Sequence, residues 1–409
     1  MAAVSGQGTT FNLPNFVGPL YKVTPRETPF LAMAGGLHGG RSITSKIVTW
    51  QTVDNADASQ PAIVEGADPS YSERSRSEVS NTVQIFQYGV EASYSKLATV
   101  GQLGDWSTRV WAVLGDQPVQ SEQAFQLMLT LERAARDVDY SMLNGAYQYP
   151  TDNNTGRKMR GILPAVSTNT VDFFSTVGTM EADFTGHGDG EDVWFISGGA
   201  AHGLQTGDEV QFTAVGSAPT EVTVDTSYWA IRASATSIQL ASTLDNALAG
   251  TAVAITADET GTFTLKKAAP LTKSGVNRLV RKMVAAGAPL REPVIFCGAF
   301  NRQRASDVYG YAPESRTVGG VNVQTIVTDF GDIPLVFERQ LPASKLLVAD
   351  MSVIEPVFLA IPGKGHFFIE DKPASGASIK QQLYGEIGLT YGYEAWHGYI
   401  QGLTTDEQV

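Results

Sequence analysis

The clearest periodic pattern lies at residues 118–144, where apolar side chains recur at intervals of three and four. They are Ala124, Leu127, Leu131, Ala134, Val138 and Met142. This spacing predicts a helix that buries one face. Pro118 suits its first turn, and Gly145 suits its end. A helix of about 25 residues would be roughly 37 Å long.

Two segments near the N-terminus instead alternate between apolar and polar residues, which is typical of strands. They are residues 42–52 and 79–94, and a polar stretch with two prolines separates them. We expect a long two-stranded excursion over residues 41–95. An isolated hairpin is only marginally stable in water. This one is therefore expected to rest on a neighbouring subunit.

Residues 1–40 read as an extended arm, because four prolines interrupt any helix and four glycines follow near its end. The arm carries large apolar residues that it cannot cover by itself, including Phe11, Phe16, Leu20, Tyr21, Phe30 and Leu31. It is expected to lie on another surface.

Residues 171–268 are rich in Thr, Ala and Gly, and short strand-like segments recur through them. We predict an inserted domain built as a small β-sandwich. Its expected strands are 193–197, 209–215, 228–233, 237–241, 252–256 and 261–266.

The chain after this domain starts with a helix at 272–287, a buried strand at 293–300 and a short helix at 301–309. Further strands follow, ending in a pair expected at 379–391 and 393–400. Helices and strands are segregated along the chain, so the predicted fold class is α+β.

Composition favours a subunit with much of its surface buried against neighbours. Only 17% of residues are charged although 43% are hydrophobic, and interface cores are depleted in charge. The net charge of −13 argues against gripping nucleic acid. The chain shows no signal peptide and no apolar run long enough for a membrane span.

Catalytic motifs are missing from the sequence. There is no phosphate-binding loop and no Gly-x-Ser-x-Gly elbow, and the five histidines are scattered. We therefore expect no enzyme activity, no cofactor and no metal. The single cysteine, Cys297, lies in an apolar strand and is interpreted as a buried structural thiol.

Two polar clusters allow alternative interpretations. Asp183, His187, Asp189, Glu191 and Asp192 could form a calcium loop, but a solvated loop is favoured. A second cluster could pair across a subunit boundary or form a solvated loop tip. The candidate subunit contacts are Glu73, Arg74, Arg76 and Glu78 of this cluster, with Trp50 and Phe30.

Four stretches, taken in order, resemble one family. They are TPRETPFLAMAGG (24–36), VTWQTVDNADASQPAIVEGAD (48–68), NTVQIFQYGVEASYSKLA (81–98) with ERAARDVDYSMLNG (132–145), and VTDFGDIPLVFERQLPASKLLVADMS (327–352) with YGEIGLTYGYEAWHGYIQGL (384–403). The family is the major capsid proteins of tailed bacteriophages with the Hong Kong 97 fold, in the branch typified by phage SU-ten. The resemblance covers nearly all of the chain except residues 171–268.

The resemblance implies a division of the chain into six parts. They are an N-terminal arm (1–40), an extended loop (41–95), a peripheral domain with a spine helix (96–170), the inserted β-domain (171–268), most of an axial domain (269–352) and return strands of the peripheral domain (353–409).

It also implies a function: self-assembly as pentamers and hexamers into an icosahedral virion head that encloses DNA. The head would be assembled in the host cytoplasm, with decoration, scaffold and portal proteins as further partners and without a membrane.

Two other classes stay open. An encapsulin would use the same fold as a protein nanocompartment. A glycan-binding virion protein would use the inserted domain, where Tyr228 and Trp229 could stack on a sugar. Adjacent residues of a strand face opposite ways, so one of these two rings is expected in the core.

Overall fold

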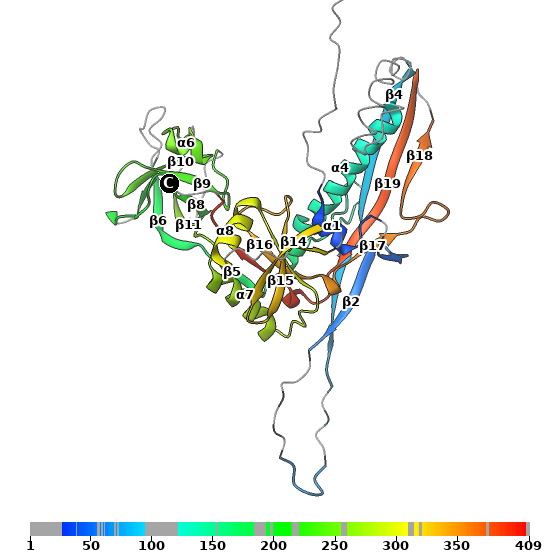
Figure 1. Ribbon diagram of the computed structural model, residues 1–409, viewed down its shortest axis with the longest axis horizontal. Helices are drawn as coiled ribbons and strands as arrows, with labels where there is room; N and C mark the ends of the chain where they lie inside the picture. Colours follow the sequence, from blue (N-terminus) through cyan, green and yellow to red (C-terminus); the bar gives the residue numbers. More distant parts are fainter. Residues whose placement is uncertain are drawn as a thin grey trace, which may run out of the picture.

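The structure of the protein, a computed structural model, describes residues 27–37, 39–54, 58, 60, 62–68, 71, 73–94, 122–152, 154–183, 194–196, 199–214, 221–254, 260–309, 315–318, 321–373 and 376–405. Two mixed assemblies of helix and sheet form the body. A β-barrel lies at one end of the body. A hairpin projects from the body (Figure 1).

A seven-stranded sheet forms the centre of the body. In spatial order its strands are β13 (Ser315–Val318), β14 (Val321–Thr328), β15 (Gly331–Phe337), β12 (Pro293–Cys297), β16 (Leu346–Asp350), β20 (Gly398–Gln401) and β5 (Thr170–Asp172). The helices α7 (Lys273–Ala285) and α8 (Ala299–Tyr309) pack against it.

The central strands of this sheet are covered on both faces. Ile295 and Val348 belong to the core beneath α7, whereas their neighbours Phe296 and Leu347 belong to a second core on the other face. All five residues of β16 are accordingly buried. This is why its sequence is a continuous apolar run rather than an alternation.

A second sheet carries the long helix. Its strands are β1 (Arg41–Ile43), β17 (Glu355–Leu359), β19 (Ser378–Thr390) and β18 (Phe367–Lys372), with β4 (Gln84–Ser93) paired along the other side of β19. Helix α4 (Glu122–Asn144) lies alongside β4 and β19 (Figure 1).

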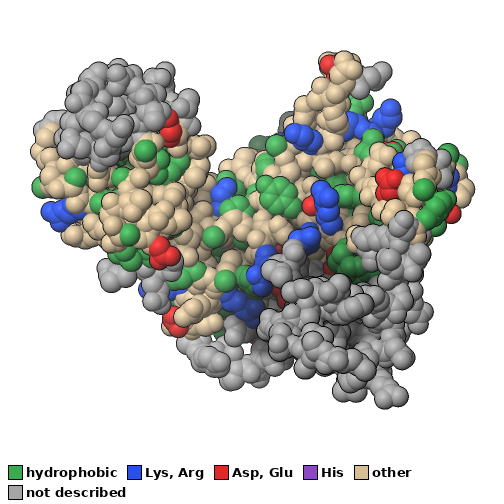
Figure 2. All heavy atoms as spheres, turned by 90° about the horizontal axis from the view of Figure 1, so that it is seen from above, with side chains coloured by type: hydrophobic (Ala, Val, Ile, Leu, Met, Phe, Trp, Pro, Cys, Tyr) green, Lys and Arg blue, Asp and Glu red, His purple; other side chains and the backbone are tan. Residues whose placement is uncertain are grey.

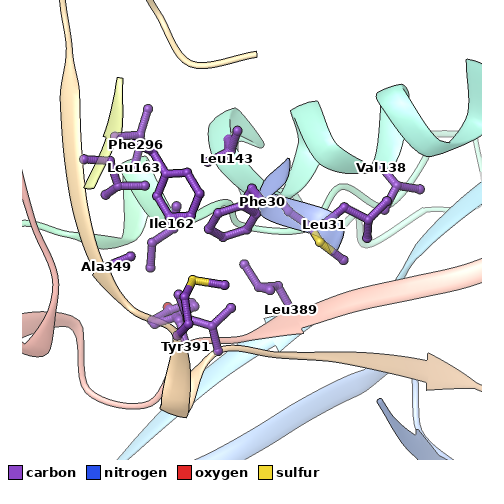
Figure 3. Close-up of a cluster of buried hydrophobic side chains, with 14 of the residues drawn as sticks. Phe30, Leu31, Val138, Leu143, Ile162, Leu163, Phe296, Ala349, Leu389 and Tyr391 are labelled. Carbon is purple, nitrogen blue, oxygen red and sulfur yellow. The ribbon is translucent and has the colours of Figure 1, made fainter. Parts of the chain in front are cut away.

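The core between the two sheets is shared. Phe296 and Ala349 of the seven-stranded sheet, Leu389 of β19 and Val138 of α4 all contribute to it (Figure 3). The short helix α1 (Pro29–Ala34) enters this core with Phe30, whose ring meets Phe296 edge-on at 5.3 Å between centroids. The remaining short helices are α5 (Ile162–Ala165), η3 (Met351–Val353) and η4 (Glu394–Trp396).

Six strands at residues 175–267 close into a barrel with its own core. In spatial order they are β10 (Ser237–Ala241), β7 (Trp194–Ile196), β6 (Ser175–Asp183), β11 (Thr260–Lys267), β8 (Glu209–Ala214) and β9 (Tyr228–Arg232). A short helix, α6 (Leu244–Leu248), follows β10. The expected β-sandwich was therefore wrong in architecture, because β9 pairs with both β8 and β10 and no sheet edge stays open. Residues 252–254 are not a strand, and β6 was missed.

The projecting hairpin consists of β2 (Ile47–Val53) and β3 (Arg76–Thr82), paired antiparallel with Trp50 opposite Val79. The predicted second strand at 79–94 is in fact two strands. After Val83 the chain leaves the hairpin, and β4 pairs with β19 instead. Phe86 and Val90 on β4 are buried, so the alternation there reflects packing in the body.

Three further expectations were wrong. The described part of the arm contains helix α1, which packs into the core. Strands β19 and β20 do not pair, because the turn at Gly392 (φ +63°) and η4 carry the chain from one sheet to the other. The buried stripe of α4 includes Ala134, Val138 and Met142 but not Leu131, which is 43% exposed.

Candidate subunit contact surfaces

The turn of the β2–β3 hairpin exposes apolar side chains that nothing in the described part of the subunit covers. Ile63 is 70% exposed, Val64 79% and Tyr71 92%. Exposed apolar groups gathered on one projection mark a surface for another protein chain. These residues were missed from the sequence, where the stretch reads as polar.

The charged cluster at the start of β3 is fully accessible. Glu73, Arg74, Arg76 and Glu78 are all exposed. The Arg76 guanidinium donates to Gln51 Oε1 at 3.1 Å across the hairpin. Among the described residues, Arg74 forms no ion pair with Glu73 or Glu78. The cluster therefore presents both signs of charge to solvent.

Trp50, a candidate subunit contact, also makes contacts within its own subunit. Its Nε1–H donates to the carbonyl oxygen of Gly392 at 2.6 Å, and its ring meets Tyr391 edge-on at 5.0 Å between centroids. These contacts attach the base of the hairpin to the end of β19.

Phe30 as a subunit contact was wrong. It is fully buried at the centre of the shared core, beside Leu163 and Leu389 (Figure 3). The sequence indicates that Phe30 must be buried. It does not indicate that residues of the same subunit bury it.

A second accessible surface runs along α4, where Met128, Leu131 and Tyr140 are exposed. A groove of about 360 Å³ lies between this helix and β4. On its wall the Tyr88 hydroxyl donates to Asp137 Oδ2 at 2.8 Å. Burial and this hydrogen bond raise the pKa of the Tyr88 phenol. The phenol therefore stays neutral and keeps its proton in the bond.

The described residues that could have carried chemistry are not brought together. Burial raises the pKa of the Cys297 thiol to about 12, so it is an unreactive core group. Among the described residues, no three His, Cys, Asp or Glu side chains are grouped to hold a metal ion. His187, Asp189, Glu191 and Asp192 of the calcium alternative lie outside the described residues.

The stacking pair proposed for glycans is divided between two environments. Tyr228 points into the barrel core, where its oxygen accepts the N–H of Thr223 at 2.9 Å. Trp229 packs on the other side, against the cluster of Ile231, Ala241 and Ala247. The two rings do not form one platform.

None of the described helices is long and apolar enough to cross a membrane.

The body consists of a long helix, a sheet beside it, a projecting hairpin and a second sheet with its own helices. This combination defines a capsid subunit of the Hong Kong 97 type.

Comparisons with known proteins agree. The family model described as SU10 major capsid protein matches residues 3–404. The chain belongs to this family and is a major capsid protein. No curated protein matches.

Solved capsid structures have a similar fold at low identity. The capsid of cyanophage A-1(L) is 12% identical, with a TM-score of 0.50 over 97% of this chain and 98% of that chain. The capsid of cyanophage P-SCSP1u is 11% identical (TM-score 0.46; 99% and 97%). The SrpI encapsulin of Synechococcus elongatus is 10% identical (TM-score 0.45; 97% and 94%).

Proposed function

We propose that this protein assembles as pentamers and hexamers into a closed icosahedral head that encloses DNA in the virion, and that it has no catalytic activity. The observation that carries the proposal is the projecting β2–β3 hairpin with its uncovered apolar turn. A two-stranded ribbon of this kind gains stability only when another surface covers it. A second subunit supplies that surface in a symmetric shell.

The parts of the subunit take the roles that the family suggests. The hairpin is the extended loop that lies over a neighbour, and α4 is the spine helix of the peripheral domain. The seven-stranded sheet with α7 and α8 forms the axial domain around the five- and six-fold axes. Strand β20 belongs to this sheet although it follows the peripheral strand β19.

Purified full-length protein tests the assembly directly. Sedimentation and electron microscopy should show closed shells, or pentamers and hexamers that convert to shells when crowding agents are added. A monomer that persists at high concentration across salts and crowding agents would contradict the proposal.

A nanocompartment of the encapsulin type is the second candidate, because an encapsulin shares the fold. The contents of particles isolated from cells separate the two. A phage head contains double-stranded DNA, whereas an encapsulin contains a protein cargo. The neighbouring genes give the same discrimination: terminase and portal genes, or a cargo enzyme gene.

We further propose that the barrel at 175–267 is an insertion facing the outside of the shell. Residues 175–267 contain twelve acidic and three basic residues, a net charge of −9 out of −13. Packed DNA would repel such a lobe. The barrel also forms a lobe set apart from the rest of the molecule (Figure 2).

An epitope inserted after Gly250, in the exposed turn that follows α6, tests this orientation. Antibody should decorate intact shells. Binding that requires disrupted shells would place the barrel inside.

A further inference from the structure

Two buried carboxyl groups hold the start of helix α1. The N–H of Phe30 donates to Glu338 Oε2 at 3.1 Å, and the N–H of Leu31 donates to Asp139 Oδ1 at 2.8 Å. Asp139 lies on α4 and Glu338 directly follows β15. Both residues are 0% exposed. The N-terminal segment of the described chain is therefore attached to the body through these two side chains.

The two carboxyl groups are also close enough that each acts on the pKa of the other. Among the described residues, no N–H or hydroxyl group donates to Asp139 Oδ2. Two ionised carboxylates this close together and away from water would repel strongly. A single proton shared between them removes the repulsion and supplies the missing donor.

Among the described residues, no positive charge replaces that proton. Arg339 follows Glu338 directly but pairs with Glu27 at 3.2 Å, and its guanidinium lies 4.9 Å from the centre of the Phe337 ring. Arg136 is the basic residue within one turn of Asp139 on α4. In the described part of the chain it forms no ion pair with either carboxyl.

Several described neighbours of the pair are uncharged. Helix α1 contains no titratable residue. On α4, Ala135 and Leu143 lie one turn before and after Asp139 and are apolar. From β12, the Cys297 carbonyl accepts the N–H of Glu338 at 2.9 Å, and the thiol of the same residue stays neutral.

We propose that the proton shared by Asp139 and Glu338 is a latch on the N-terminal segment: helix α1 stays docked in the core while the pair holds the proton, and is released when both carboxyls ionise. The proposal concerns the single subunit and does not depend on the shell.

The direction of the pH effect follows from where the pair titrates. Burial, and then the negative charge of Glu338, raise the pKa of Asp139 to about 8. Free carboxyl groups titrate near pH 4. The docked state therefore binds more protons than the released state between about pH 4 and pH 8. Docking weakens as the pH rises through this window and is least favourable above it.

Hydrogen–deuterium exchange of the full-length protein tests the latch. The readout is the protection factor of a peptide spanning α1, corrected for the intrinsic pH dependence of amide exchange. Protection should fall at least about tenfold between pH 6 and pH 9. Between the pKa values of the released and docked states, each pH unit weakens the docking equilibrium of α1 by up to about tenfold. Sedimentation at each pH confirms that the compared samples share one assembly state.

Two isosteric variants remove the proton exchange and keep the hydrogen bonds to α1. In Asp139→Asn the amide oxygen still accepts from Leu31 and the amide NH₂ donates to Glu338. Protection of α1 should then be the same at pH 6 and pH 9. Glu338→Gln should behave alike, and it serves where the first variant does not fold.

Asp350→Asn is the matched control. Asp350 is equally buried, but it accepts the N–H groups of Arg291, Glu292 and Ser352, which outweigh its burial and lower its pKa. This change should leave the pH dependence at α1 as in the parent. The latch is overturned if parent protection does not fall with pH, or if the Asn and Gln variants keep the parental fall.

Discussion

At the residue scale, buried polar side chains of this subunit connect separate segments through hydrogen bonds. Asp350, at the end of β16, fixes the loop before β12 through the N–H groups of Arg291 and Glu292 at 3.0 and 3.2 Å. His397 accepts the N–H of Asp350 at Nδ1 and bonds the Tyr391 carbonyl through Nε2. A buried group of this kind is tolerated because its polar atoms have partners.

His397 should make the subunit less stable in mild acid. Burial lowers the pKa of its imidazole, and a neutral ring is needed to accept from Asp350. An unfolded histidine titrates near 6.5, so the unfolded state binds more protons below that pH. The free energy of unfolding should therefore fall between pH 7 and pH 5.5, by up to about 1.4 kcal/mol.

Denaturant unfolding of unassembled parent and His397→Gln at both pH values measures this contribution. The carboxyl pair of Asp139 and Glu338 gives the opposite slope, but it is common to both proteins and cancels in the difference. An equal pH dependence in the two proteins would show that His397 does not titrate as argued.

Trp50→Phe should cost about 1 kcal/mol of the unfolding free energy, the usual worth of one hydrogen bond. The substitution removes the Nε1–H bond to Gly392 and keeps an aromatic ring against Tyr391. Urea unfolding of the unassembled subunit provides the measurement. No change in the midpoint would mean that the hydrogen bond contributes nothing to stability.

At the scale of elements, local sequence patterns predicted which helices and strands form. The segments that pack against each helix or strand, which lie far away in the sequence, determine which of its residues are buried. Helix α4 was expected at 118–144 and spans Glu122–Asn144 in the described residues. Its inner half follows the expected stripe because β4 and β19 lie beneath it. The stripe fails at Leu131, where no described segment covers the helix. The apolar periodicity predicts which face of the helix is buried. It does not predict how far along the helix another segment covers that face.

The barrel and the second half of the predicted hairpin show the same limit. Strand β10 was predicted with its observed bounds, Ser237–Ala241. Closure depends on β9 pairing with β8 and β10, and such pairing is not encoded in any short segment. The carboxyl pair was missed because Asp139 and Glu338 lie 199 positions apart in the printed sequence, and neither forms a motif.

Two substitutions on α4 should separate its buried and accessible parts. Val138 is fully buried, so Val138→Asp places an unpaired charge in the shared core and should prevent folding. Leu131→Asp meets solvent and should change the free energy of unfolding by less than about 1 kcal/mol. Circular dichroism with denaturant separates the two. Similar losses in both variants would contradict the observed limit of the stripe.

At the scale of the whole molecule, the barrel is the part least dependent on the rest. Its core contains Phe212 and Phe263, whose rings meet edge-on, and all the described residues of this core lie within 175–267. Among the described residues, its polar contacts with the body include the Glu209 carboxylate, which accepts the N–H of Thr405 at 2.8 Å, and Lys266, which pairs with Asp172 at 3.9 Å.

A fragment of residues 174–268 should therefore fold alone and melt cooperatively by circular dichroism. The broken bond to Thr405 exposes Glu209 to water, which hydrates the carboxylate. A fragment without a cooperative transition would show that the body is needed for the barrel to fold.

The projecting hairpin, in contrast, is proposed to contact a neighbouring subunit. Arg74→Asp with Arg76→Asp should leave folding intact, because both side chains are exposed and, among the described residues, the side-chain hydrogen bond that the change removes is the exposed one from Arg76 to Gln51. Assembly should be impaired, because charge reversal at an interface places like charges against the partner surface. Circular dichroism reports folding, and sedimentation reports assembly at matched concentration and salt.

The matched control is Lys372→Asp on β18, an exposed charge reversal remote from the hairpin. If the double variant assembles as the parent does, Arg74 and Arg76 are not at a subunit contact. If it fails to fold, the hairpin stabilises the isolated subunit, and its exposed turn can no longer be explained by a neighbour alone.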